Sequence, residues 1–164
     1  MENGHSGTSR NVDNPGIAAW RPAALQLSSV FLGLLLHAWW PFESSLLVNV
    51  SRIAGPLFLG IALSIVALGY REFFKAKTTL RPDRGANALI RSGPFAYSRN
   101  PLYVAVMIVI LGVGVWVNSL WIIGMLIPLF FVMSRAVIAP EEAYLESRFG
   151  QEYLDYKKSV RRWL

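Results

Sequence analysis

The sequence contains no cysteine. Disulfide bonds, thiolate metal sites and a cysteine nucleophile are therefore excluded. Histidine is almost as scarce, because only His5 and His37 occur. His5 lies in a polar stretch rich in Gly, Ser and Asn, and His37 lies inside an apolar run. We interpret His37 as a helix histidine near a membrane interface, and neither histidine predicts a metal centre.

Charge is also low, since 16% of the 164 residues are charged and 54% are hydrophobic. Soluble domains average about 25% charged residues. The apolar residues gather in four runs, at 22–40, 53–70, 102–117 and 119–134. At ~1.5 Å rise per residue, the first two nearly span a bilayer core of about 30 Å. The sequence therefore predicts an all-α polytopic membrane protein with about four transmembrane helices and short cytoplasmic C-terminal helices.

The sequence predicts one folded domain after a polar N-terminal segment. We expect a disordered polar N-terminus over residues 1–21 and a single membrane domain over 22–164. The last two apolar runs are separated only by Asn118 and Ser119, which predicts a tight hairpin. A signal peptide is not expected, because some twenty polar residues precede the first apolar run.

The net charge of +6 does not predict a nucleic-acid partner, because the basic residues follow the membrane topology. Seven of them fall in 71–101 and six in 135–164. By the positive-inside rule these segments and both termini face the cytoplasm. We expect an integral protein of the bacterial inner membrane, with membrane lipids as partners and its functional site formed by 71–101 and 135–164.

The polar stretch before the third apolar run ends in residues that are typical of a helix start. Asn100 is a favoured N-cap and Pro101 a favoured first helical residue. Gly93-Pro94 predicts irregular backbone at membrane depth, which is tolerated where it lines a cavity or is covered by protein. The helix N-terminus with Arg99 beside it is a suitable seat for a carboxylate, although a capped helix with an arginine at the lipid headgroups explains the same pattern.

Two adjacent carboxylates, Glu141 and Glu142, follow Pro140 just after the fourth run. Glutamates behind a proline are typical of a helix start. Two carboxylates facing a basic loop are also what a cationic small molecule needs. A sulfonium nucleoside carries an ammonium and a carboxylate, which a glutamate and Arg99 could respectively hold.

The C-terminal segment predicts two short helices, 143–149 and 151–159, separated by Gly150. Their aromatic and apolar residues are spaced as a packing stripe. The basic end that includes Arg162 either anchors to anionic lipid or reaches back over the site.

The assembled pattern resembles the superfamily of isoprenylcysteine carboxyl methyltransferases and phospholipid methyltransferases. The likeness covers roughly residues 73–164. The matching residues are Lys77-Thr78-Thr79-Leu80-Arg81-Pro82, Gly93-Pro94-Phe95, Arg99-Asn100-Pro101-Leu102-Tyr103, Glu141-Glu142, Leu145, Phe149-Gly150, Tyr153, Tyr156, Val160 and the terminal basic pair.

This resemblance implies a cytoplasm-facing site for S-adenosylmethionine and a lipophilic, membrane-borne methyl acceptor. The residues that it implies as catalytic are Arg99, Asn100, Glu142 and Arg162. Those that it implies for the cofactor are Gly93, Pro94, Tyr97, Arg99, Asn100, Pro101, Tyr103, Glu141 and Glu142. Direct methyl transfer needs positioning and complementary charge more than a covalent nucleophile.

One departure concerns the acceptor. Isoprenylcysteine enzymes typically have Arg-His-Pro where this chain has Arg99-Asn100-Pro101. Asparagine cannot be a titrating base. Carboxyl O-methylation, phospholipid N-methylation and small-thiol S-methylation therefore all stay open, as does a non-catalytic role in membrane assembly or lipid binding.

Overall fold

The computed structural model describes residues 20–76 and 88–164. Every regular element in these ranges is helical, which confirms the predicted all-α class. The expected disordered N-terminus lies outside the described residues, apart from Trp20 and Arg21, which belong to the first helix. The basic segment 77–87 also lies outside them.

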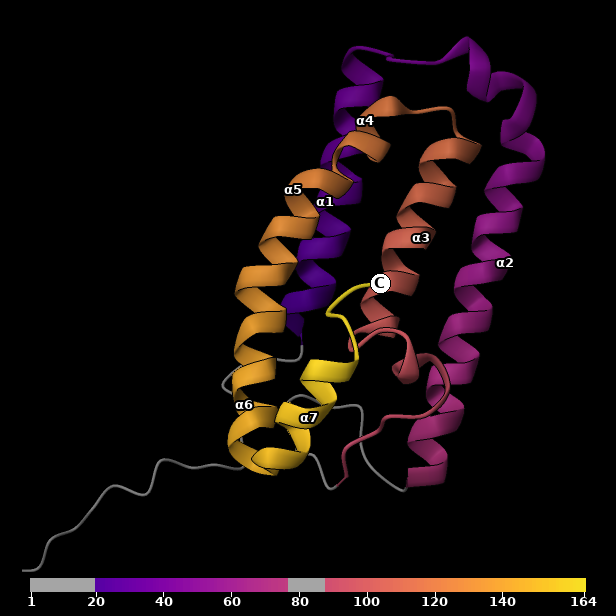
Figure 1. The fold of residues 1–164 in the computed structure, drawn as a ribbon. Helices are drawn as coiled ribbons and strands as arrows, with labels where there is room; N and C mark the ends of the chain where they lie inside the picture. Colours follow the sequence, from indigo (N-terminus) through magenta and orange to yellow (C-terminus); the bar gives the residue numbers. More distant parts are fainter. Residues whose placement is uncertain (1–19, 77–87) are drawn as a thin grey trace, which may run out of the picture.

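The first two helices lie on opposite sides of the bundle (Figure 1). Helix α1 spans Trp20–Trp39, close to the expected 22–40. Helix α2 spans Ser45–Ala76, well beyond the expected 53–70. Its 32 residues correspond to roughly 48 Å, so its ends project past a bilayer core. Counting apolar residues detects only the central part of such a helix, because the projecting ends carry polar residues such as Arg52 and Glu72.

The predicted hairpin is present. Helix α3 (Pro101–Trp116) ends in a turn in which Asn118 adopts a left-handed φ of 52°. The side chain of Ser119 then caps the next helix by accepting a hydrogen bond from the Ile122 N–H. Asn118 Oδ1 also accepts from the Ser44 N–H at 3.1 Å, which ties the hairpin to the connection between α1 and α2.

The last long helix extends from Leu120 to Phe149, with one turn residue, Met125, between its first two parts. It comprises α4 (Leu120–Gly124), α5 (Leu126–Val132), a π-helix η2 (Met133–Ile138) and α6 (Ala139–Phe149). The helix thus continues beyond residue 134, the expected end of the fourth transmembrane segment, and the expected new helix start at Pro140 is wrong. Pro140 lies in the first turn after η2, and Ile138 before it is already helical at φ −71°. The bend between α4 and α5 follows from Pro128, which has no N–H to donate to the Gly124 carbonyl.

Figure 1 shows α3 at the centre of the bundle, with α2 on one side and α1 and α5 on the other. Close packing uses glycines: a Cβ on Gly55 would lie 2.6 Å from Trp116 Cβ, and one on Gly33 would lie 2.9 Å from Ile122 Cα. The buried core between α3 and the last long helix consists of Ile110, Ile122, Leu129, Met133 and Val137.

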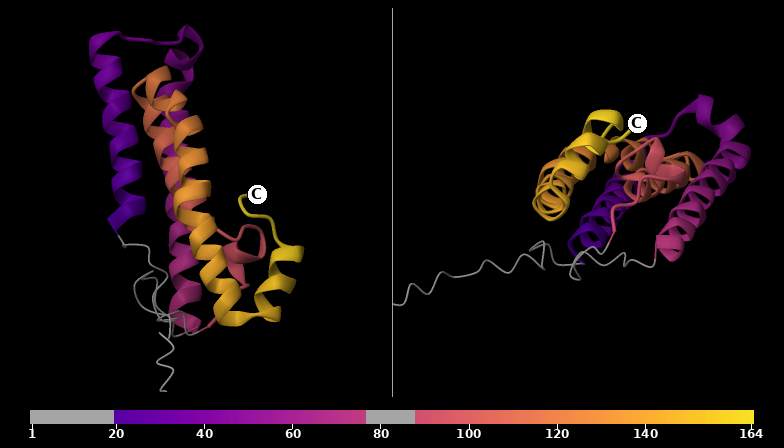
Figure 2. Two further views of the ribbon diagram at one scale, coloured as in Figure 1. Left: turned by 90° about the vertical axis from the view of Figure 1, so that its left-hand side faces the viewer. Right: turned by 60° about the horizontal axis from the view of Figure 1, so that its bottom comes forward.

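Three helices are long and apolar enough to cross a membrane, namely Arg21–Trp39, Ser45–Ala76 and Leu120–Phe149, among the residues described. The apolar α3 is shorter, at 16 residues. After α6 the chain reverses at Gly150, where φ is +55°, and forms α7 (Gln151–Ser159). The two views in Figure 2 show α7 folded back beside α6, with the C-terminal tail turning up along the bundle.

Candidate active site

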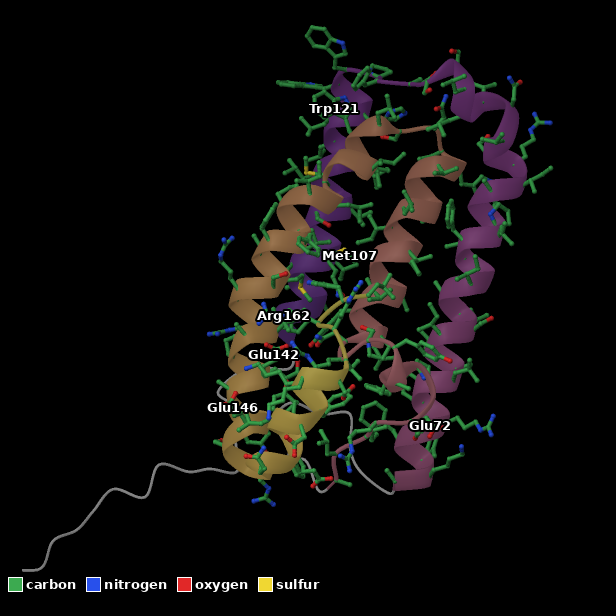
Figure 3. The ribbon with its side chains drawn as sticks, in the orientation of Figure 1. Glu72, Met107, Trp121, Glu142, Glu146 and Arg162 are labelled. Carbon is green, nitrogen blue, oxygen red and sulfur yellow. The ribbon has the colours of Figure 1, made fainter. Side chains whose placement is uncertain are left out.

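Glu142 lies at the centre of a buried charge cluster. Arg99 Nη2 donates to Glu142 Oε1 at 2.7 Å. Arg162 Nε donates to the same oxygen at 3.1 Å and Arg162 Nη2 donates to Oε2 at 2.5 Å. This bidentate contact fixes the plane of the carboxylate. The Arg99 and Glu142 side chains are only 8% and 7% exposed, whereas Arg162 is 38% exposed. The three side chains come from the turn before α3, from α6 and from the tail, and Figure 3 shows Glu142 and Arg162 adjacent between α6 and α3.

The cluster is not fully satisfied. Arg99 Nε is buried and has no hydrogen-bond partner in the described part of the chain. A buried donor without a partner is costly, and here two guanidinium groups share one carboxylate. The cluster therefore has capacity for a further hydrogen-bond acceptor, and an anionic one suits its charge.

The C-terminal tail is held on the start of α3 by its backbone. The Arg161 carbonyl accepts from the Arg99 N–H at 2.9 Å, and the Arg162 carbonyl accepts from Asn100 Nδ2 at 2.9 Å. Asn100 therefore occupies the N-cap position of α3 but makes no side-chain cap, which differs from the sequence expectation. The reason is competition, because the tail carbonyl engages the amide that would otherwise face the helix end.

Glu141 and Tyr103 form a second polar contact between the last long helix and α3. The Tyr103 hydroxyl donates to Glu141 Oε2 at 3.2 Å. The two adjacent glutamates thus have different partners, since Glu142 meets the arginines and Glu141 meets a neutral hydroxyl.

The π-helix decides which of these glutamates faces the arginines. From α5 onward, the buried positions of the last long helix are Leu129, Met133, Val137, Ile138 and Glu142. In an uninterrupted α-helix of 3.6 residues per turn, the face through Met133 and Val137 would next reach Pro140 or Glu141. The wider turn of η2 holds one extra residue, so the neighbours Val137 and Ile138 are both buried and Glu142 continues the face.

The Gly93-Pro94 stretch forms a short 3-10 turn, η1 (Gly93–Ala96), in which Gly93 adopts φ +61°. Phe95 anchors it: its ring contacts Phe73 of α2 edge-on at 5.5 Å, and its carbonyl accepts from the Tyr156 hydroxyl of α7 at 2.7 Å. Burial raises the pKa of Tyr156 to about 12, although the positive charge of Arg99 opposes the shift, so the hydroxyl keeps the proton that it donates.

An apolar groove of about 500 Å³ opens between α2 and this turn. The groove is lined by Ile65, Leu68, Arg71, Glu72, Gly93, Pro94, Tyr97, Ser98, Pro101, Val104 and Leu164. Tyr97 is 78% exposed at its edge. The groove lies on the α2 side of the start of α3, whereas Glu142 lies on the α6 side.

The site residues expected from the sequence thus fall into two sets. Arg99, Asn100, Tyr103, Glu141, Glu142 and Arg162 make the contacts between α3, α6 and the tail. Gly93, Pro94, Tyr97 and Pro101 line the groove. Their catalytic and cofactor-binding roles stay predictions.

Several contributors were not expected from the sequence. Glu72 was not among the expected site residues, yet it lines the groove and is buried. Ser98 and the tail backbone also act through hydrogen bonds that no residue pattern reveals, because a carbonyl accepts irrespective of its side chain. Glu72 alone gave a signal, as a carboxylate at the end of a membrane helix.

The contact with Glu142 changes the pKa of Arg162. Its hydrogen bonds to Glu142 raise the pKa of the guanidinium, since they favour the charged form. Arg162 thus stays a cation and continues to compete for the Glu142 carboxylate.

Comparison with known proteins identifies the family. The phospholipid methyltransferase family matches residues 50–152, which is more than half of the chain. The chain belongs to the phospholipid methyltransferase family. This membership confirms the superfamily resemblance drawn from the motifs and makes the chain an integral membrane protein of a methyltransferase family.

Individual relatives carry varied names. The cobalt-zinc-cadmium resistance protein CzcN of Cupriavidus metallidurans is 31% identical over 160 residues, covering 93% of this chain and 67% of that protein. An uncharacterized protein of Haemophilus influenzae is 44% identical over 64 residues, which are 38% of this chain and all of that protein. The nickel-cobalt-cadmium resistance protein NccN of Alcaligenes xylosoxydans is 35% identical over 75 residues, covering 46% of this chain and 35% of that protein.

Among solved structures, the eukaryotic intramembrane Ras methyltransferase ICMT is similar with a TM-score of 0.46 and 22% identity. The match covers 88% of this chain and 52% of ICMT, so the chain spans about half the length of that protein.

Proposed function

We propose that this protein is an S-adenosylmethionine-dependent methyltransferase that acts on a lipophilic, membrane-borne acceptor. The observation that carries the proposal is the Arg99–Glu142–Arg162 cluster with its unpartnered Arg99 Nε. It brings acidic and basic groups that are far apart in the sequence to one end of the bundle. Membership of a methyltransferase family supports the same reading.

The residues present fit the cofactor. S-adenosylmethionine carries a carboxylate and an ammonium and, when bound, supplies a methyl group activated by a sulfonium. Arg99 and Arg162 would hold the carboxylate, and the buried Arg99 Nε is the free donor. Glu142 or Glu141 would hold the ammonium, and Asn100 would fix the adjoining tail.

The side chains of the protein would contribute to the reaction by positioning the ligand and by complementing its charges. Arg99 and Glu142 are nearly inaccessible to solvent, so their interactions act in a medium of low dielectric constant. Burial of these two side chains would also keep water away from a ligand group held between them. Arg162 is the more exposed arginine, and its release from Glu142 would free carboxylate capacity for a ligand ammonium.

The groove beside α2 suits the apolar part of the acceptor. Its walls are mostly apolar, Leu68 in its lining is partly exposed, and Arg71 and Glu72 are its charged lining residues. An acceptor held there would lie next to Ser98 and Pro101, at the start of α3. Carboxyl O-methylation of a prenylcysteine-like acceptor and small-thiol S-methylation both fit this arrangement.

A second candidate is N-methylation of a phospholipid such as phosphatidylethanolamine. It is favoured by the family description and by Asn100, which cannot act as a titrating base. Incubation with labelled S-adenosylmethionine and a panel of phosphatidylethanolamine, prenylcysteine analogues and free thiols separates the reactions. Label in the lipid fraction alone selects N-methylation, and label in prenylcysteine alone selects O-methylation.

We further propose that the site faces the cytoplasm at a bacterial inner membrane. The excess of Lys and Arg in 71–101 and 135–164 supports this orientation. Single cysteines introduced as Arg148→Cys and Glu43→Cys test it in intact cells. A thiol reagent that does not cross the membrane should label the cysteine at position 43 and not the one at position 148.

Cofactor binding is tested by calorimetry with S-adenosylhomocysteine in detergent. We expect Glu142→Gln and Arg99→Ala each to weaken binding by at least about tenfold, a loss of ~1.4 kcal/mol or more. Arg91→Ala is the matched control, because its ion pair with Glu152 is half exposed on both sides and lies outside the cluster. Wild-type protein that binds no S-adenosylhomocysteine would leave only the non-catalytic assembly or lipid-binding role.

A further inference from the structure

Glu72 is a buried acidic residue that the proposed chemistry does not use. It lies near the end of α2 and is 8% exposed. Lys75 Nζ donates to its Oε1 at 2.7 Å, and the Ser92 hydroxyl donates to its Oε2. Figure 3 shows Glu72 on α2, across the bundle from Glu142. Both carboxylate oxygens of this buried side chain therefore accept a hydrogen bond.

The turn that follows Ser92 is packed directly on this side chain. Gly93 has φ +61°, a conformation that glycine adopts without strain. A Cβ at Gly93 would lie 2.8 Å from Glu72 Cγ, so no larger residue fits there without movement. Glu72 therefore contacts the turn twice, through the Ser92 hydroxyl and through the bare backbone of Gly93.

The turn leads straight into the charge cluster. Its other end is fixed by the Tyr156 hydroxyl on the Phe95 carbonyl at 2.7 Å. Ser98 Oγ then accepts from the Asn100 N–H at 3.1 Å, immediately before α3. Arg99 stands between them, so the path of the turn decides where its guanidinium points.

We infer that Glu72 is a positioning residue for the candidate active site. By holding Ser92 and Gly93 it fixes the Ser92–Ser98 turn, and through that turn the placement of Arg99 and Asn100 against Glu142 and the tail. Its importance for catalysis rests on the proposed function, whereas its hold on the turn does not. Lys75, whose side chain is 54% exposed, balances the charge of Glu72 and contributes little to position.

Hydrogen–deuterium exchange tests the hold on the turn without any ligand. Glu72→Ala should raise amide exchange across residues 92–100, and Glu72→Gln should restore most of the protection, because an amide oxygen still accepts from Ser92. Ser92→Ala should give part of this increase, and the double variant should add little to Glu72→Ala, since both changes remove the hydrogen bond between Ser92 and Glu72. Lys75→Ala is the matched control and should exchange like wild type. Unchanged exchange in Glu72→Ala would overturn the inference.

A second measurement separates positioning from general loss of stability. Glu72→Ala should weaken S-adenosylhomocysteine binding by about tenfold, while Glu72→Gln stays within about threefold of wild type. Ile122→Val lowers stability at the α3–α4 core, far from the turn, and should leave affinity unchanged. Equal losses in Ile122→Val and Glu72→Ala would reject a positioning role. If the wild-type protein binds no S-adenosylhomocysteine, the proposed function fails while the exchange experiment still decides the role of Glu72.

Discussion

Trp163 donates its indole Nε1–H to Ser134 Oγ at 3.1 Å, and its ring packs on Phe130 at 4.9 Å. The residue before it, Arg162, makes the bidentate contact with Glu142. The tail is thus attached to the π-helix by one residue and to the charge cluster by the next. Any change that loosens Trp163 should therefore reach Arg162.

We predict that Trp163→Ala weakens S-adenosylhomocysteine binding more than Trp163→Phe. Phenylalanine keeps most of the packing on Phe130 but loses the hydrogen bond to Ser134, which contributes about 1 kcal/mol to stability. Alanine loses the ring contact as well, so Trp163→Ala should lower the free energy of unfolding by about 3 kcal/mol or more. Calorimetry and thermal unfolding check both values. Ser134→Ala should match Trp163→Phe, and a Ser134→Ala variant indistinguishable from wild type would contradict the hydrogen-bond part.

The π-helix gives a prediction about chain length. Ala136 is exposed within η2, and the buried face already shifts by one residue there. Deleting Ala136 should convert the segment to plain α-helix and leave Glu142 facing the arginines, so cofactor affinity should stay within about threefold of wild type. Inserting one alanine after Ala136 should rotate Glu142 by roughly 100° and abolish binding. Loss of binding in a folded deletion variant would contradict this account.

A titrating group at position 100 should make stability depend on pH. In Asn100→His the imidazole has an ordinary pKa of about 6.5, and the adjacent Arg99 and Arg162 disfavour a further cation. Its pKa in the folded protein should therefore fall below the unfolded value. The variant should therefore be most stable above about pH 6.5 and should lose stability as the pH falls toward 5. Melting temperatures between pH 5 and 8 check this, and Asn100→Ala should show no such trend relative to wild type.

Two glycines of α2 provide a matched test of helix packing. Gly55→Ala should destabilise the protein by about 1–3 kcal/mol, because the new Cβ would lie 2.6 Å from Trp116 Cβ. Gly60→Ala places its Cβ in open space and removes a poor helix former, so it should be neutral or stabilising by up to about 1 kcal/mol. Unfolding in a denaturing detergent series compares them. Equal stability of the two variants would show that α2 and α3 do not pack as described.

The sequence predicted the parts of this protein that depend on local chemistry. Asn118 and Ser119 predicted the hairpin because the two residues leave no other place for a turn. The length of α2 was underestimated, since polar residues such as Glu72 belong to helix that extends beyond the apolar run. The helix start at Pro140 was wrong because a π-turn accommodates the proline, and nothing in Met133–Ile138 signals such a turn.

The charge cluster was predictable only in part. Arg99 and Glu142 were singled out as residue types that suit a zwitterionic ligand, and the structure brings them into contact. The tail's attachment could not be foreseen, because it depends on the carbonyls of Arg161 and Arg162 and on the fold that carries them there. The role of these residues in binding stays a prediction for the experiments above.

The shortness of α3 relates the protein to the membrane around it. Its 16 residues reach roughly 24 Å from the Asn118 turn to Asn100, less than a hydrocarbon layer of about 30 Å. Either the surrounding lipid thins near this helix or the Asn100 end sits beneath the interface. Acyl-chain length is therefore a physical variable for this protein, and membranes of different lipid composition present the same polar groups at different depths.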